Sequence, residues 1–199
     1  MILDVLNREL PGLPKHASPR MVGEWAQSVV ENVFKSGLTA SIGQAVQKDF
    51  GLKDMEDVAL TDPYGNYVAI DVKTHNKDKN SRPNVTSVER LAEFYRKDTF
   101  FFSLLLAKYR MSGDRPIFDE VQFFPVEHLH WNSLGLGALG KGQIQIATPQ
   151  NIIVDTTQTR KQWMLELCAK LADFYPCEIE RINDRIKYFD DTRIFWESK

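Results

Sequence analysis

The sequence predicts an α/β (α+β) domain in which helices flank a central mixed β-sheet. Apolar residues recur at helical spacing near both ends of the chain, whereas the middle of the chain alternates between apolar and polar residues as strands do. Helices and strands in this arrangement form layers around one hydrophobic core. The composition agrees, because 43% of the 199 residues are hydrophobic and 26% are charged. These values exclude disordered and collagen-like chains.

The first expected helix covers 19–36. Ser18 precedes Pro19 in the manner of an N-cap followed by proline at the first helical position. Apolar residues then recur at helical spacing as far as Gly37, which is suited to follow a helix end. A second, weaker helix is expected over 39–49.

A β-hairpin is expected next. Residues 57–61 and 67–73 alternate as strands do, and 62–66 between them have the sequence Asp-Pro-Tyr-Gly-Asn, which is typical of a turn. A polar, basic loop is expected over roughly 74–84, followed by a helix over 85–97.

The second half of the chain is expected to add strands and to end in helices. Its expected strands are 99–109, 117–126 and 143–146, its glycine-rich irregular segment is 134–142, and its helices lie near 158–174 and 177–190. The apolar residues of these last helices are expected in a core or at a subunit contact, with Trp196 as a candidate for the contact.

We expect one domain over 1–199, with an N-terminal segment at 1–18, a core at 19–175 and a helical tail at 176–199. The net charge of −2 excludes a generally basic nucleic-acid binder, but it allows a basic cleft. No apolar run approaches the roughly 20 residues of a membrane span, and the N-terminus does not resemble a secretory signal. With two cysteines only, a cytoplasmic location is expected.

The hairpin carries the residues of greatest chemical interest. If its strands pair regularly about Tyr64, Asp57 faces Asp71 across the ladder, where opposed Cβ atoms lie about 4.5–5.5 Å apart. Lys73 lies two residues beyond Asp71 and shares its face. The opposite face collects the apolar set Val58, Leu60, Val68, Ile70 and Val72. One face therefore holds two carboxylates and an ammonium together.

Two neighbouring carboxylates repel each other when both are ionised, so they favour a bound cation. Mg²⁺ fits such a pair, because it uses one or two carboxylates together with waters and substrate phosphate. A nearby lysine can position an attacking water and offset phosphate charge. The triplet fits metal-assisted phosphodiester hydrolysis. In the alternative interpretation Asp57 and Asp71 are ordinary strand residues, and Lys73 only pairs with one of them.

Asp57, thirteen intervening residues and then Asp71-Val72-Lys73 resemble the PD-(D/E)xK nuclease signature, with Glu56 in place of its proline. The segment Ile70-Asp71-Val72-Lys73-Thr74-His75-Asn76 resembles type II restriction endonucleases of the HincII kind and, more loosely, SwaI. Further matches follow in the same order at Gly23-Glu24, Pro83-Asn84, Gln143-Ile144-Gln145-Ile146 and Thr159-Arg160-Lys161-Gln162-Trp163. The resemblance spans roughly 20–175 and leaves 1–18 unmatched.

The resemblance implies a restriction-endonuclease-like core and a homodimeric, magnesium-dependent enzyme of a restriction-modification system. Such an enzyme hydrolyses phosphodiester bonds of double-stranded DNA at a short, palindromic site. By resemblance Asp57 and Asp71 would bind Mg²⁺, and Lys73 would lie beside the attacking water. Glu24 would be an accessory carboxylate that projects from the first helix, unless it is simply a solvated helix residue.

The segment after the catalytic motif is rich in positive charge. Residues 73–82 hold four fixed positive charges and one negative charge. Such a loop can contact DNA phosphates without reading sequence, although a solvated charged loop is the alternative. The candidate DNA contacts here are Thr74, His75, Asn76, Lys77, Lys79, Arg82 and Asn84, of which Asn84 could instead cap the following helix.

Base reading is expected, by resemblance, near Gln143. The glycines on either side of Lys141 would let the backbone approach DNA closely. Lys141 could then contact guanine and Gln143 adenine in the major groove. Gln143 and Gln145 could equally be solvent-facing residues of an edge strand.

Two other classes of protein stay open. One is another PD-(D/E)xK nuclease, such as a repair nickase or a junction resolvase. The other is a DNA-binding module that has lost catalysis, against which the intact Asp57, Asp71 and Lys73 argue. The cleavage pattern on long duplex DNA separates these alternatives.

Overall fold

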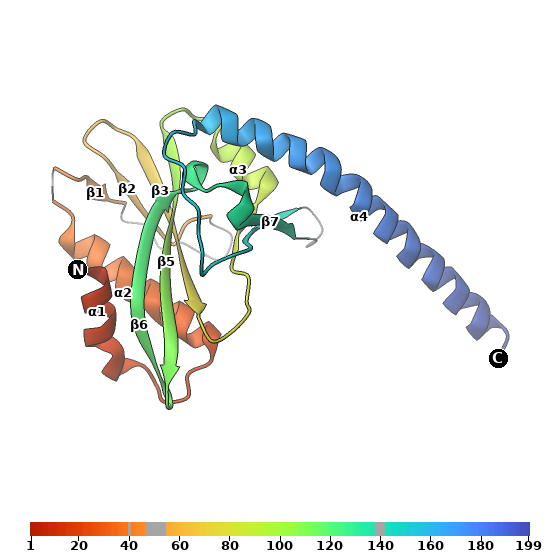
Figure 1. Ribbon diagram of the computed structural model, residues 1–199, viewed down its shortest axis with the longest axis horizontal. Helices are drawn as coiled ribbons and strands as arrows, with labels where there is room; N and C mark the ends of the chain where they lie inside the picture. The colour runs from red at the N-terminus through yellow and green to blue at the C-terminus, as the bar shows by residue number, and fades with distance from the viewer. Residues whose placement is uncertain (40, 47–54, 138–141) are drawn as a thin grey trace. The chain divides into compact units, whose positions relative to one another are not determined.

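The computed structural model describes residues 1–39, 41–46, 55–137 and 142–199. The chain divides into two compact units, Met1–Thr157 and Gln158–Lys199. The first unit contains two β-sheets with three α-helices, and the second is built on one long helix, α4 (Arg160–Glu197) (Figure 1).

The N-terminal part forms two helices, α1 (Ile2–Glu9) and α2 (Pro19–Gly37). The Ser18 hydroxyl accepts a hydrogen bond from the Met21 backbone N–H at 3.3 Å, so it caps α2 as predicted. The helix expected over 19–36 is confirmed.

The main sheet has five strands in the order β1-β2-β3-β5-β6. Strands β3 and β5 run parallel, whereas the other neighbouring pairs are antiparallel. The predicted mixed sheet with flanking helices is therefore confirmed. The strands are β1 (Gln44–Ala45), β2 (Val58–Thr61), β3 (Tyr67–Asn76), β5 (Phe100–Ser112) and β6 (Arg115–Pro125).

The two faces of this sheet meet different elements. Val72 and Leu105 belong to the core that α1 and α2 build on one face. On the other face of β5, the Phe102 ring lies 6.1 Å from the ring of Phe94 in α3 (Val88–Phe94). Because neighbouring residues of a strand point to opposite faces, Asp71 and Lys73 lie on the face away from α1 and α2.

Helix α1 covers the edge of the sheet at β6. The Asn7 side chain donates to the Phe118 carbonyl at 2.8 Å and accepts from the Phe118 N–H at 3.1 Å. It thus satisfies both backbone groups of an edge residue, as a neighbouring strand would.

A smaller sheet has three strands in the order β4-β8-β7. They are β4 (Asn84–Ser87), β7 (Leu134–Gly137) and β8 (Gln143–Ile146). The strand expected over 143–146 is confirmed, and it lies in the centre of this sheet rather than at an edge. Part of the segment expected to be irregular is a strand, because Leu134–Gly137 pairs with β8.

Three boundary predictions need correction. The helix expected over 39–49 is wrong where the structure describes it, because Gln44–Ala45 pairs with β2 as strand β1. The basic loop begins later than expected, since β3 continues to Asn76. The helix expected over 85–97 begins at Val88, after a strand rich in β-branched residues, with the Ser87 hydroxyl accepting from the Arg90 N–H.

The two C-terminal helices are in fact one helix of 38 residues, α4. Thr159 and Gln162 form a capping box at its start. Pro176 lies inside α4, and the helix continues through it although proline lacks a backbone donor and its ring crowds the carbonyl four residues earlier. In the described part of the chain, no helix combines the length and apolarity that membrane crossing demands. Short 3₁₀ turns occur at η1 (Leu10–Gly12), η2 (Val126–His128) and η3 (Trp131–Ser133).

Candidate catalytic and nucleic-acid site

The hairpin β2–β3 has the predicted register. Val58 pairs with Ile70 and Leu60 with Val68. The pairing becomes irregular beyond β2, because the Asp57 N–H donates at 2.9 Å to the carbonyl of Ile70, the residue that already pairs with Val58. The Asp57 carboxylate turns back to β3, and its Oδ2 accepts from the Val72 N–H at 2.7 Å. This contact brings the Asp57 carboxyl group beside Asp71, the neighbour of Val72 in β3.

Lys73 completes the predicted triplet. Its ammonium donates to Asp71 Oδ1 at 2.5 Å. Asp71 is only 3% exposed, whereas Lys73 is partly open to solvent. The second carboxylate oxygen, Asp71 Oδ2, is buried and accepts no hydrogen bond from an N–H or hydroxyl of the residues that the structure describes. Its carboxyl group lies within hydrogen-bond reach of the Asp57 carboxyl group, so the two acids interact through a shared proton or a shared cation.

Burial dominates the electrostatics of the two carboxyl groups. Burial raises the pKa of Asp71 to about 7; the Lys73 ammonium opposes this rise and the Asp57 charge adds to it. Burial also raises the pKa of Asp57, against the Val72 N–H and Lys73, which stabilise its charged form. Both acids therefore hold protons more tightly than free carboxyls, and a cation between them would favour their ionised forms.

The donor set fits Mg²⁺. Within the described ranges, no cluster of three or more His, Cys, Asp or Glu side chains is arranged to hold a metal ion. Mg²⁺ needs no such cluster, because it keeps several waters and takes other ligands from substrate phosphate. Asp57 and Asp71, whose carboxyl groups face each other, supply the one or two carboxylates that this ion requires.

Glu24 does not join the triplet. Its carboxylate accepts from Arg20 on the same helix at 2.8 Å, and its side chain is 61% exposed. Its neighbour Gly23 packs against Thr74, so this part of α2 covers the face of β3 opposite to Asp71. The α2 carboxylate whose charge acts on Asp57 is that of Glu31, which the sequence did not single out.

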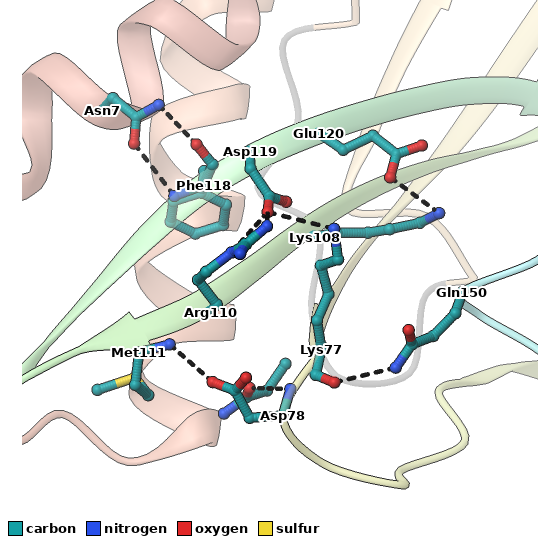
Figure 2. A network of polar contacts seen from close by, with 11 residues as sticks. Asn7, Lys77, Asp78, Lys108, Arg110, Met111, Phe118, Asp119, Glu120 and Gln150 are labelled. Carbon is teal, nitrogen blue, oxygen red and sulfur yellow. Dashed lines mark hydrogen bonds and ion pairs between the residues drawn. The ribbon is translucent and has the colours of Figure 1, made fainter.

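Beyond the triplet, a polar network surrounds the ends of β3, β5 and β6 (Figure 2). Asp119 accepts from Lys77 at 3.2 Å and from the Arg110 guanidinium at 2.5 Å. The register of β5 and β6 shifts by one residue at this point, which leaves Asp119 between the paired residues Phe118 and Glu120. A bulge of this kind turns a side chain out of the regular pleat.

His75 and Lys108 are polar residues buried beneath this network. They are each 1% exposed, and the Lys108 ammonium pairs with Glu120 at 3.2 Å. Burial and then the charges of Lys108 and Lys77 lower the pKa of His75, so its imidazole is neutral at pH 7. His75 contacts Ser81 through Nδ1 at 3.4 Å. Lys108 directly follows the apolar run 104–107 of β5, so a charged residue at the end of a buried run was the sequence signal for this site.

A cavity of about 410 Å³ opens beside the basic segment, residues 73–82. Residues 77–80 form one wall and 147–151 the other, with His75 also in the lining. The Gln150 amide donates to the Lys77 carbonyl at 2.9 Å and ties the walls together (Figure 2). The sequence predicted the first wall as a DNA contact but missed the second, because no local motif links residues so far apart.

The remaining predicted DNA contacts fall into two groups. Thr74 faces α2. Asn76 is buried, and its side-chain oxygen accepts from the Asp78 N–H at 2.9 Å. In this structure both side chains therefore contact the protein itself. Lys79 and Arg82 are exposed on the loop after β3.

Asn84 and Gln143 belong to the smaller sheet. Asn84 is exposed and accepts from the Gln145 amide at 2.7 Å, so it does not cap α3. Gln143 shares a strand face with Gln145, because Ile144 and Ile146 are fully buried on the other face. Lys141 lies outside the described residues.

No protein-family model matches the chain, and no curated protein matches it.

Proposed function

We propose that this chain is a Mg²⁺-dependent endonuclease of the PD-(D/E)xK type that hydrolyses phosphodiester bonds in double-stranded DNA. The observation that supports this most is the pair of neighbouring carboxyl groups of Asp57 and buried Asp71, beside the Lys73 ammonium. A fold retains a costly arrangement of buried charge chiefly where it serves a function.

Each member of the triplet has a role. Asp57 and Asp71 would hold Mg²⁺, which, when bound, supplies positive charge to the phosphate and acidifies a bound water. The Lys73 ammonium, held by Asp71 and partly open to solvent, provides a donor that orients the attacking water. The Val72 N–H fixes the Asp57 carboxylate against β3.

The basic segment would hold the DNA. Lys79 and Arg82 are exposed, so these two cations can contact phosphates, whereas Lys77 lines the adjoining cavity with its ammonium paired to Asp119. Gln143 on β8 offers an amide for base reading in the major groove. This division into phosphate contacts and base contacts is the one that sequence-specific DNA binding requires.

Within this type, we propose a type II restriction endonuclease that cuts a short, palindromic site. The order of the sequence motifs from Gly23-Glu24 to Trp163 favours it over a repair nickase or a junction resolvase. A DNA-binding module without catalysis is disfavoured, because such a protein gains nothing from a buried acid pair with raised pKa values.

Digestion of a sequenced genome with Mg²⁺, followed by mapping of the ends, tests the type of nuclease. The proposal predicts discrete fragments whose ends share one short sequence, and no fragments from the matched Asp71→Asn protein. Single-strand nicks or cuts confined to branched DNA would instead support the repair or junction nuclease.

A further inference from the structure

Helix α4 carries a repeating apolar stripe that the proposed catalysis does not use. Beyond Pro176 the residues of this stripe recur at alternating intervals of three and four positions along the helix. This alternation over three heptads is the spacing of a coiled-coil seam. The seam consists of Ile179, Ile182, Ile186, Phe189, Arg193 and Trp196.

The seam lies open on the helix. Its five apolar side chains are 50–66% exposed. The positions directly opposite the seam are polar or small, namely Cys177, Asp184, Asp191 and Ser198. Off the seam, Tyr188, Ile194 and Phe195 are also exposed, and unlike the seam residues they do not recur through all three heptads. Because most helices in proteins are stabilised by packing of their apolar face, a seam of this kind calls for a partner.

We propose that the seam pairs with the seam of a second copy of this chain, as a parallel two-stranded coiled coil. The heptads of this seam begin at Ile179, Ile186 and Arg193. In a parallel pair, the residue just before each heptad start contacts the partner residue whose number is five higher. Arg185 meets the partner's Asp190, which is an attractive pair. The two other such contacts, Glu178 with the partner's Asn183 and Thr192 with the partner's Glu197, bring no like charges together.

Arg193 is the one polar residue of the seam, and it fixes the register. A single polar residue at such a position disfavours shifted pairings, in which it would face apolar side chains. The Arg193 guanidinium lies 3.8 Å from Asp190 and 3.6 Å from Glu197 of its own helix. These carboxylates flank the seam and offset the repulsion between the two arginines in a parallel pair.

The area that a second copy must cover exceeds what the two aromatic seam residues supply. An aromatic side chain buries about 150–250 Å², so the 66% of Phe189 and Trp196 that is exposed supplies roughly 200–330 Å². A specific interface takes about 800 Å² from each partner. The isoleucines and the aliphatic stems of flanking side chains must therefore be covered too, which requires pairing along the whole seam.

This inference goes beyond the proposed function and stands on α4 alone, so it is tested without DNA or metal. If the catalytic proposal also holds, the dimer places two nuclease centres in one particle, as two-fold symmetric DNA sites require. A failure of either proposal leaves the other standing.

Molar mass in solution tests the dimer. Light scattering after gel filtration at tens of micromolar should give twice the 22.9 kDa of one chain. Ile182→Glu with Ile186→Glu should raise the dissociation constant about 100-fold or more. The matched control is Tyr188→Glu with Ile194→Glu, since these residues are 65% and 59% exposed but lie off the seam; it should stay dimeric. A monomeric wild type, or equal effects of the two double substitutions, overturns the proposal.

Disulfide cross-linking tests the orientation without weakening the seam. In a protein with Cys168→Ser and Cys177→Ser, Ile182→Cys should give a covalent dimer on mild oxidation, because parallel pairing brings the same seam position of both chains together. Asp184→Cys, on the opposite side of the helix, is the matched control and should stay uncross-linked. Cross-linking of the control alone, or of neither protein, contradicts a parallel seam.

Discussion

At the residue scale, the site depends on Asp71, whose carboxyl the fold holds in an environment that suits a cation or a proton. The pKa of this group is about 7 in the folded chain, against 3.8 for an ordinary aspartate. Between these pH values the folded state binds a proton that the unfolded state has released, so stability falls as pH rises from about 4 to about 7 in the absence of metal.

Replacing this buried charge should stabilise the metal-free protein. The net shift of about three pKa units corresponds to about 4 kcal/mol and already includes the opposing interaction with Lys73. We expect Asp71→Asn to be more stable than wild type at pH 8 in a chelator, by up to about 4 kcal/mol in urea unfolding, and to lose this advantage near pH 4. Destabilisation by Asn at both pH values would show that the carboxylate is well solvated or well paired.

Lys73 separates catalysis from simple charge neutralisation. If its compact ammonium positions the attacking water, the planar guanidinium of Lys73→Arg cannot replace it. We expect single-turnover cleavage to slow by about 10²-fold or more, while DNA affinity in Ca²⁺ falls much less. A rate within about threefold of wild type, a barrier change under about 1 kcal/mol, would reduce Lys73 to a phosphate contact.

The triplet was predictable from sequence because strand alternation and a single hairpin turn determine which residues face each other. The register from Val58–Ile70 onward follows from the position of the turn at 62–66. The polar network around Asp119 was not predictable, because it depends on a bulge between β5 and β6 that no local motif announces. Glu24 was misplaced because helix periodicity does not say which face of the sheet α2 covers.

At the element scale, the structure depends on how helices cover the main sheet. Asn7 joins α1 to the edge strand β6 through two hydrogen bonds to Phe118 (Figure 2). We expect Asn7→Ala to lower the free energy of unfolding by about 1–3 kcal/mol, because both bonds are partly buried.

Urea unfolding measures this difference, with Arg8→Ala as the control, since Arg8 follows on the same helix with a side chain that is 71% exposed. A loss no greater than that of the control would mean that apolar packing alone holds α1 in place.

Sequence patterns predicted the elements whose own periodicity decides their structure, such as α2 with its Ser18 cap. Sequence patterns failed for the elements whose structure depends on pairing with a distant segment. Gln44–Ala45 is a strand only because β2 lies beside it, and β4 forms only against β8. The gap expected between two C-terminal helices is absent, because α4 continues through Pro176.

At the scale of the whole molecule, the net charge of −2 hides a local concentration of positive charge after β3. DNA affinity should therefore depend on a few cations. Replacing Lys79 and Arg82 by alanine should weaken binding in Ca²⁺ and reduce the slope of log affinity against log salt by about 2.

The matched control for this measurement is Lys15→Ala, another lysine on the surface, whose side chain is 66% exposed. An unchanged salt slope in the Lys79→Ala, Arg82→Ala protein would place the DNA elsewhere on the molecule.

The central claim is that Asp57, Asp71 and Lys73 form a magnesium-dependent nuclease centre. Titration of plasmid cleavage with Mg²⁺ tests it most directly, with Ca²⁺ as the metal that accepts the same carboxylates but in looser geometry. Wild type should cut only with Mg²⁺ and bind DNA with either ion, whereas Asp71→Asn should bind DNA in Ca²⁺ and not cut in Mg²⁺. Cleavage that proceeds in a chelator, or that the folded Asp71→Asn protein performs at the wild-type rate, would contradict the claim.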